Sequence, residues 1–202
     1  MVVRYQIGVD EAGRGALAGP VCVGAVLMPQ TFDWQEAYAL VTRRGPPRLR
    51  DSKRLSAQQR ATLYDYITTH GTLKYAFAFV DAPTIDTIGI VNAACEAASV
   101  AVQHLGVSSS RAEVLLDAGL RVSSVWAQHS FVRGDETVPV IALASVVAKV
   151  ARDRLMEDEA LLYKQYRFDE HKGYGTLAHC KAVRQYGMCL LHRRTFCRAI
   201  VS

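Results

Sequence analysis

The 202-residue sequence predicts an α/β fold, with a mixed five-stranded sheet flanked by helices and a helical C-terminal segment. Two observations lead to this class. Early apolar segments of strand length alternate between apolar and polar residues, which is typical of half-buried strands. Later segments alternate between strand-like and helix-like patterns, which favours a helix-covered sheet. Since no repeat or linker divides the chain, we expect one domain over residues 1–202, with about 154–202 as a helical extension of the same unit.

The first two strands are predicted from alternation and from the turn between them. From residue 5 to residue 10 the odd positions are apolar and would face one side of a strand, which leaves Asp10 on the other side. Glycines at positions 13 and 15 then favour a turn, and Pro20 ends the loop. The apolar run 21–28 has the length of a second strand, which we expect to pair with the first in antiparallel fashion.

The later elements follow from a capping residue and from changes of period. Ser56 is a preferred N-cap for a helix over residues 57–68, and residues 73–80 alternate as a third strand. The remaining predicted elements are a helix over 86–105, a strand buried on both faces over 114–117, a fifth strand over 138–143, a helix from there to about residue 163, and a helix over 177–185.

Positive charge is concentrated in two segments. The net charge is +5, which fits a polyanionic partner. Residues 43–54 contain six basic residues and one acidic residue, and residues 164–202 contain eight basic residues and two acidic ones. Solvated loops could have either composition alone. Because the two segments flank a set of acidic residues, contacts with nucleic-acid phosphates are the favoured interpretation.

Other protein classes are disfavoured. No segment has the roughly 18 consecutive apolar residues of a membrane span, and the N-terminus lacks a secretory pattern, so we expect a cytoplasmic protein without membrane contact. No GxxxxGK[ST] loop indicates a nucleotide-binding enzyme. The five cysteines include no CxxC pair, which argues against disulfides. A zinc site would use Cys180, Cys189, His192 and Cys197, but their spacing matches no common motif, and reduced thiols are favoured.

Four acidic residues occupy positions that are unusual for unpaired carboxylates. Asp10 and Glu11 end the first strand, Asp117 ends another, and Asp153 lies on the inward face of a predicted helix. If the strands of Asp10 and Asp117 are neighbours, all four groups meet at one end of the sheet. Such oxygen ligands suit Mg²⁺ or Mn²⁺. Two of these ions, roughly 3.5–4 Å apart, can promote displacement at a phosphodiester.

Each of these acidic residues also has a structural interpretation. Asp10 and Glu11 could be turn residues, and Asp153 could pair with Lys149 or Arg152 one helical turn or less away. A lone Asp117 or Asp153 is more often structural than functional, because a desolvated carboxylate needs a partner of some kind. The set of four is what indicates a metal centre.

Six motifs occur in order along nearly the whole chain. They are GVDEAGRG at 8–15 followed by LAGPV at 17–21, DSKRLS at 51–56, LD at 116–117, ASVVAKVARDR at 144–154, HKGYGT at 171–176, and HRRTF at 192–196. Together they resemble the motifs of bacterial ribonuclease HII. The departures are small: Ala16 stands where that family usually has proline, and Ala118 separates Asp117 from the glycine that usually follows it.

The resemblance implies a ribonuclease H-like fold and a monomeric endonuclease. Its substrates would be RNA–DNA hybrids and DNA duplexes that contain ribonucleotides. The cut would fall 5′ to the ribonucleotide and leave a 3′-hydroxyl and a 5′-phosphate. Asp10, Glu11, Asp117 and Asp153 would be catalytic and would bind two divalent ions, Mg²⁺ or Mn²⁺.

The resemblance also implies how substrate is recognised. The backbone of Gly13, Arg14 and Gly15 would bind the ribose 2′-hydroxyl, the group that distinguishes RNA from DNA. The ring of Tyr174 would stack near the junction of ribonucleotide and deoxyribonucleotide. The residues expected to contact phosphates are Ser52, Lys53, Lys149, Lys172, Arg193 and Arg194.

Two rival functions explain part of the pattern. A duplex-binding protein without catalysis accounts for the basic segments, but its carboxylates would repel phosphates. A different two-metal nuclease on a related fold accounts for the acidic residues, whereas the glycine-flanked Arg14 and Tyr174 favour ribose recognition.

Overall fold

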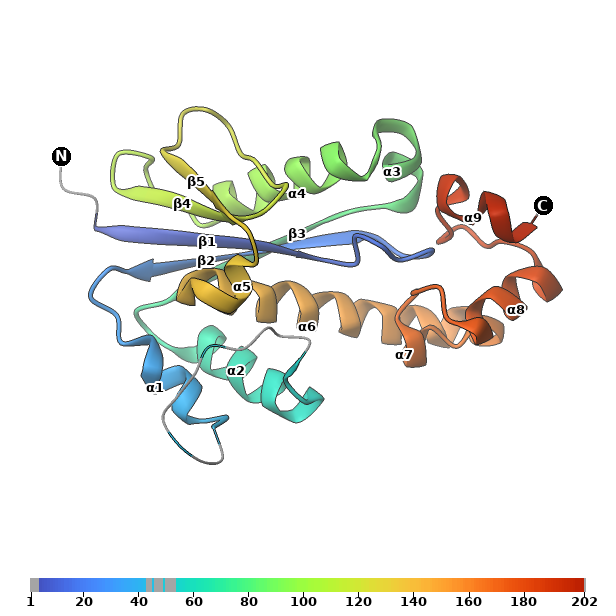
Figure 1. The fold of residues 1–202 in the computed structure, drawn as a ribbon, viewed down its shortest axis with the longest axis horizontal. Coiled ribbons are helices and arrows are strands. Elements are labelled where there is room, and N and C mark those ends of the chain that lie inside the picture. The colour runs from blue at the N-terminus through green and yellow to red at the C-terminus, as the bar shows by residue number, and fades with distance from the viewer. Residues whose placement is uncertain (1–3, 43–44, 46–48, 50–53, 202) are drawn as a thin grey trace.

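A computed structural model describes residues 4–42, 45, 49 and 54–201 (Figure 1). The expected phosphate contacts Ser52 and Lys53 lie outside the described residues, as does most of the basic segment 43–54. Among the described residues, no single helix is long and apolar enough to cross a membrane.

The centre of the fold is a mixed five-stranded sheet with the strand order β3-β2-β1-β4-β5. The strands are β1 (Tyr5–Ala12), β2 (Val21–Pro29), β3 (Lys74–Val80), β4 (Ala112–Asp117) and β5 (Gln128–Phe131). The first three pair in antiparallel fashion, while β4 runs parallel to β1 and β5 parallel to β4. The predicted α/β class with a mixed five-stranded sheet is confirmed.

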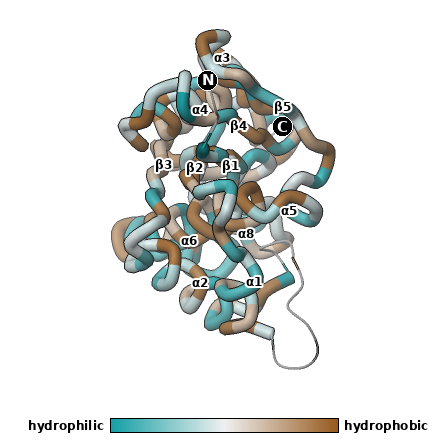
Figure 2. Tube along the Cα trace, turned by 90° about the vertical axis from the view of Figure 1, so that its left-hand side faces the viewer, coloured by the Kyte–Doolittle hydropathy of each residue, from teal (hydrophilic) through white to brown (hydrophobic). Residues whose placement is uncertain are grey.

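Helices cover both faces of the sheet (Figures 1 and 2). The helices are α1 (Trp34–Ala39), α2 (Ala57–Thr69), α3 (Ala82–Ile88), α4 (Ile90–His104), α5 (Gly134–Thr137), α6 (Pro139–Leu162), α7 (Phe168–His171), α8 (Leu177–Tyr186) and α9 (Arg194–Val201). One face packs on α4, which supplies a row of buried alanines. The other face packs on α6, with α1 and α2 beyond it.

Two glycines in the central strands allow α6 to approach the sheet closely. A Cβ atom at Gly8 would lie 2.1 Å from the carbonyl oxygen of Val140, and one at Gly24 would lie 2.5 Å from that of Ala144. Any larger residue at either position would therefore push the helix away. Because Asp10 pairs with Gly24 across β1 and β2, this close approach brings α6 directly over Asp10.

The predicted fifth strand over 138–143 is wrong, because these residues form the first turns of α6. Val138 is the N-cap and Pro139 is the first helical residue, a position where the fixed φ of proline suits a helix. Residues 140–143 are fully buried, and a short buried apolar run has the same pattern in a strand and in a core helix. The fifth strand is instead β5, which has only four residues.

The predicted helix over 86–105 is two helices. They are α3 and α4, and Gly89 separates them with a positive φ of 79°.

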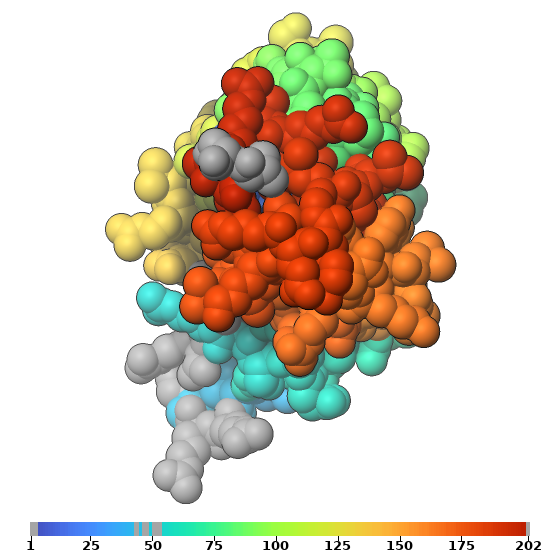
Figure 3. Space-filling view, turned by 90° about the vertical axis from the view of Figure 1, so that its right-hand side faces the viewer, coloured from blue at the N-terminus to red at the C-terminus, as the bar shows by residue number. Residues whose placement is uncertain are grey.

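The C-terminal segment returns to the loop between β1 and β2. Helix α6 continues without a break past residue 154 to Leu162, and α7, α8 and α9 then cover this end of the molecule (Figure 3). The amide of Leu17 donates to the carbonyl of Gly173 over 2.9 Å, and the amide of Arg193 donates to the carbonyl of Leu17 over 2.8 Å. These bonds join the first hairpin of the chain to its last helices.

Candidate active site

Three carboxylates converge where β1 and β4 end. The two strands are parallel neighbours with Val9 opposite Leu116, so Asp10 and Asp117 follow at the same edge. One oxygen each of Asp10, Glu11 and Asp117 can be chosen so that all three lie within 4.8 Å of one another. The expectation that the strands of Asp10 and Asp117 are neighbours is confirmed. The donor set is purely carboxylate oxygen, which fits Mg²⁺ or Mn²⁺ better than softer metals.

Asp10 is the most deeply buried of the three, with 4% of its surface exposed. Burial raises the pKa of its carboxyl well above the ordinary value, and the neighbouring charges of Glu11 and Asp117 raise it further. The hydroxyl of Ser145 on α6 donates to the same carboxyl and lowers the pKa in part. A bound cation would favour the ionised form and relieve this repulsion.

The other two carboxylates are held by specific donors. Nη1 of Arg14 donates to Oε1 of Glu11 over 2.9 Å, and the backbone amide of Gly134 donates to Oδ1 of Asp117 over 2.8 Å. Each contact uses part of one carboxylate. Their geometry is therefore set by the protein before any ligand arrives.

The structure does not bring Asp153 into this group. Its Oδ1 accepts a hydrogen bond of 2.7 Å from Nζ of Lys149, four residues earlier on α6. This is the structural pairing that the sequence left open. Among the described acids, the set that lies within 4.8 Å around Asp10 contains Glu11 and Asp117 but neither Asp153 nor Asp135.

Asp135 is an acidic residue that the sequence analysis missed. It follows Gly134, whose amide binds Asp117, and only 7% of its surface is exposed. A Cβ at Gly134 would lie 2.7 Å from Cδ1 of Ile141, so the glycine lets α5 pack tightly beside the end of β4. A Gly-Asp pair shortly before Pro139 was the available signal, because a carboxylate in the first turn suits a helix N-terminus.

A cavity of about 560 Å³ opens beside the carboxylates. It is lined by Glu11, Ala12, Gly13, Arg14, Gly15, Arg60, Ser145, Lys149 and Tyr174. The β1–β2 loop, α2, α6 and the loop before α8 each contribute. Five of the residues expected to bind substrate therefore share one cavity with a carboxylate. Arg60 of α2 was not predicted, since an arginine within a helix has no distinguishing sequence signal.

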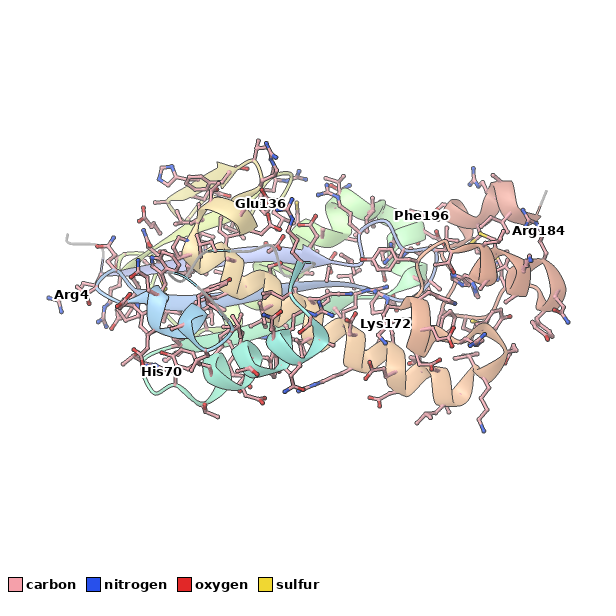
Figure 4. The ribbon with its side chains drawn as sticks, turned by 60° about the horizontal axis from the view of Figure 1, so that its bottom comes forward. Arg4, His70, Glu136, Lys172, Arg184 and Phe196 are labelled. Atoms are coloured by element: carbon pink, nitrogen blue, oxygen red, sulfur yellow. The ribbon has the colours of Figure 1, made fainter. Side chains whose placement is uncertain are left out.

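Three of the expected phosphate contacts do not line this cavity. Nζ of Lys172 pairs with Oε1 of Glu157 over 2.9 Å, where the C-terminal helices meet α6 (Figure 4). Arg194 is exposed, and its backbone amide donates to Asp86 over 2.7 Å. Arg193 is fully buried. A guanidinium without exposed surface cannot touch a phosphate, so Arg193 is not available for the expected contact in this conformation.

Gly13 and Gly15 of the β1–β2 loop are glycines for different structural reasons. Gly13 has a φ of +86°, and a Cβ there would lie 1.9 Å from Nε of Arg152. Gly15 faces open space, since a Cβ there would meet nothing within 4 Å. Gly13 is thus required by packing, while Gly15 leaves the backbone accessible from the cavity.

A chain of buried histidines supports the loop that carries Tyr174. The amide of Cys189 donates to Nδ1 of His192 over 3.0 Å, so the proton of neutral His192 is on Nε2. That atom lies 3.1 Å from Nε2 of His179 and donates to it. The proton of His179 is then on Nδ1, which donates to the carbonyl of Tyr174 over 2.9 Å. Both rings must be neutral for this chain to form.

Protonation of these histidines should therefore destabilise the protein as pH falls. Burial and the neighbouring His179 lower the pKa of His192 to about 4, and burial lowers that of His179. The pKa of His192 in the folded protein is below its ordinary value of 6.5. The contribution of neutral His192 to the unfolding free energy is therefore complete above pH 6.5 and is lost as the pH falls from 6.5 to about 4. Each such histidine adds a slope of up to about 1.4 kcal/mol per pH unit.

Urea unfolding of the wild type and of His192→Gln between pH 7.5 and 4 measures this effect. The variant should have a shallower loss of unfolding free energy. His104→Gln removes an exposed histidine of α4 and should keep the wild-type slope. Equal slopes in all three proteins would contradict a neutral, buried His192.

The possible zinc site does not form. All five cysteines are free. In the part of the chain that the structure describes, the carboxylate group is the one set of three or more potential ligands that lie close enough to share an ion.

One family model and several known proteins are similar to this chain. The model described as Ribonuclease HII matches residues 7–199. The chain is 40% identical over 194 residues to Ribonuclease HII of Syntrophus aciditrophicus, covering 96% of this chain and 84% of that protein. It is 36% identical over 200 residues to Ribonuclease HII of Caldicellulosiruptor bescii, covering 98% and 89%. The structure of ribonuclease H2 from Pyrococcus horikoshii has a TM-score of 0.72 over 98% of this chain and 97% of that one, and its 24% identity supports the fold alone.

Proposed function

The chain belongs to the ribonuclease HII family, and we propose that it incises duplex DNA 5′ to embedded ribonucleotides by two-metal-ion catalysis, leaving 3′-hydroxyl and 5′-phosphate ends. Membership confirms the resemblance drawn from the six motifs. It makes the chain a type 2 ribonuclease H, an endonuclease that acts on RNA–DNA hybrids. The convergence of Asp10, Glu11 and Asp117 carries the proposal.

In this proposal the three converging carboxylates hold divalent ions, Mg²⁺ or Mn²⁺. When bound, such ions supply an activated water and charge stabilisation at the leaving oxygen. Asp10 is the central ligand, because its buried carboxyl has two acidic neighbours and gains most from a cation. Oxygens of Glu11 and Asp117 that are not used by Arg14 and Gly134 complete the set.

We assign the fourth acidic position to Asp135 in place of Asp153. Asp135 is buried and follows directly the residue whose amide binds Asp117. The carboxylate of Asp153 is paired with Lys149. The assignment is supported by the position of α5 at the carboxyl end of β4, the edge where the metal ligands gather.

The cavity beside these carboxylates would hold the ribonucleotide. The backbone of Gly13, Arg14 and Gly15 would bind its 2′-hydroxyl, and Tyr174 would stack on the neighbouring sugar or base. Lys149 and Arg60 line the same cavity and would contact phosphates, as would Ser52 and Lys53. The exposed Arg194 and the partly exposed Lys172 would make weaker contacts farther along the duplex.

The test is incubation with a DNA duplex that carries one ribonucleotide. In the presence of Mg²⁺ or Mn²⁺ we expect a single nick on its 5′ side, and with excess chelator we expect none. A nick elsewhere, or cleavage of hybrids alone, would contradict the specificity proposed. The free cysteines fit the reducing cytoplasm, where we propose that the protein acts as a monomer.

Tyr174→Ala should impair cleavage at one embedded ribonucleotide more than it impairs affinity for plain duplex DNA. We expect kcat/KM to fall about tenfold to a hundredfold, because a stacking contact is worth about 1–3 kcal/mol. Steady-state kinetics and a binding titration with all-DNA duplex measure the two effects. Tyr186→Ala removes an exposed tyrosine of α8 and should change neither. Equal losses of cleavage and affinity in Tyr174→Ala would argue against its role at the junction.

A further inference from the structure

Two arginines are fully buried behind the cavity. They are Arg152 of α6 and Arg193, which precedes α9, and both have 0% exposed surface. Burying a guanidinium is costly unless its donors are satisfied. Burial lowers the pKa of Arg193 to about 9, which reflects that cost. Because two such costly groups are buried next to each other, we expect their hydrogen-bonding geometry to serve a function.

The described hydrogen bonds of both guanidiniums go to backbone carbonyls. Arg152 donates to the carbonyls of Pro20, Ala18 and Lys172 over 2.9, 3.1 and 2.8 Å. Arg193 donates to the carbonyls of Gly19 and Arg14 over 3.0 and 2.9 Å. Four of these five carbonyls belong to residues 14–20, the loop between β1 and β2. The two side chains thus bind the inner surface of the loop that lines the cavity.

The bond from Arg193 fixes the orientation of one particular peptide group. In a planar trans peptide the N–H points away from the C=O. Since the carbonyl of Arg14 points inward to Arg193, the N–H of Gly15 points outward. Gly15 is exposed and lines the cavity. Among the described residues its N–H has no hydrogen-bond acceptor. The Gly15 N–H can therefore donate a hydrogen bond to a ligand in the cavity.

Arg152 connects this loop with the opposite wall of the cavity. The carbonyl of Lys172 that it binds lies two residues before Tyr174. Its guanidinium carbon lies 5.4 Å from the centre of the Tyr174 ring. Amides of Leu17 and Ala18 donate to the carbonyl of Gly173 over 2.9 and 3.2 Å, which joins the same two segments. Arg152 therefore helps these backbone bonds to set the spacing between the Gly15 amide and Tyr174.

We propose that Arg193 and Arg152 are positioning residues for recognition of the ribose 2′-hydroxyl. Arg193 orients the Gly15 N–H toward the cavity, and Arg152, together with the backbone bonds to Gly173, holds that donor at a set distance from Tyr174. Neither touches substrate. This inference rests on the proposed function, because it explains how the proposed ribose contact is preorganised. A preformed donor costs less ordering on binding and so discriminates better.

The test uses Arg193→Lys. An ammonium group cannot donate from a rigid fork to the carbonyls of Gly19 and Arg14 together. Binding is titrated in Ca²⁺ with a duplex that carries one ribonucleotide and with the all-DNA duplex of the same sequence. The ratio of the two Kd values measures 2′-hydroxyl discrimination. We expect Arg193→Lys to reduce the wild-type ratio at least fivefold while affinity for the all-DNA duplex changes less than twofold. Arg152→Lys should reduce the ratio in the same direction.

Two controls separate positioning from a general structural role. The shift of Tm on adding Mn²⁺ should equal that of the wild type, since the metal carboxylates are untouched. Arg198→Lys changes an exposed arginine of α9 and should keep the wild-type ratio. A lower Tm for Arg193→Lys with an unchanged Kd ratio would overturn the inference and leave the proposed function intact. No discrimination by the wild type would overturn the proposed ribose recognition itself.

Discussion

Replacing Asp10 by asparagine should abolish turnover and at the same time stabilise the folded protein. A metal-bound transition state gains several kcal/mol from the ion, so loss of the central ligand should lower kcat by about a thousandfold or more. Asparagine is close to aspartate in size and keeps the contact with Ser145 possible. We therefore expect substrate binding to persist.

The gain in stability follows from the raised pKa of Asp10. An acid whose folded pKa is above its unfolded value of 3.8 destabilises the folded state once pH exceeds 3.8, because only the unfolded chain then ionises freely. Below pH 3.8 both states are protonated and the penalty disappears. Asp10→Asn should accordingly have a higher Tm than the wild type at pH 7 without metal, and the difference should vanish near pH 3.

Thermal unfolding at both pH values, with and without Mn²⁺, checks this prediction. Mn²⁺ should raise the Tm of the wild type and have little effect on Asp10→Asn. Asp158→Asn changes an exposed carboxylate of α6 and should match the wild type in activity, Tm and response to Mn²⁺. Normal turnover by Asp10→Asn, or a lower Tm at pH 7, would contradict the role assigned to the buried carboxyl.

The second large effect should distinguish Asp135 from Asp153. Asp135→Asn should lower kcat by about a hundredfold or more, which corresponds to about 2.7 kcal/mol of transition-state stabilisation. Asp153→Asn should lower it about twofold, because it breaks a partly exposed i,i+4 ion pair with Lys149. The two variants have the same chemistry, so each is the control for the other.

Single-turnover kinetics over a range of Mn²⁺ concentrations separates the two variants further. Asp135→Asn should need more Mn²⁺ to reach half of its maximal rate, whereas Asp153→Asn should follow the wild-type curve. The reverse result would restore Asp153 as the fourth ligand and remove Asp135 from the site.

The sequence predicted the part of the site that depends on strand ends. Asp10, Glu11 and Asp117 could be found because each ends an apolar run of strand length, and the ends of parallel neighbours meet at one edge. Gly15 and Tyr174 could be found only through the motifs, since nothing in the pattern of either segment indicates that the two lie close in space.

Asp135 was not among the candidates from the sequence because of where α6 begins. Residues 138–143 have the apolar, β-branched character of a strand, and assigning them so left Asp135 in an unstructured loop. The helix α5 has only four residues, too few to produce a period. Asp153 shares a helix face with buried valines, but the partner that satisfies it is Lys149 on the same face.

Arg193 shows a second limit of sequence analysis. An arginine next to another arginine near the end of a basic chain is usually exposed. Here the carbonyls that satisfy it belong to residues 14 and 19, and only the tertiary fold brings them together. Burial of a charged residue could not be deduced from its neighbours in the chain.

The hydrogen bonds that join Leu17 to Gly173 and Arg193 determine when the cavity can form during synthesis of the chain. The two walls of the cavity are separated by most of the sequence, and the wall that contains Tyr174 is synthesised after the sheet. A nascent chain can complete its sheet and gather its carboxylates while that wall is still missing. The proposed capacity to select ribose should therefore arise only once residues 173 and 193 have been synthesised and have packed on the first hairpin.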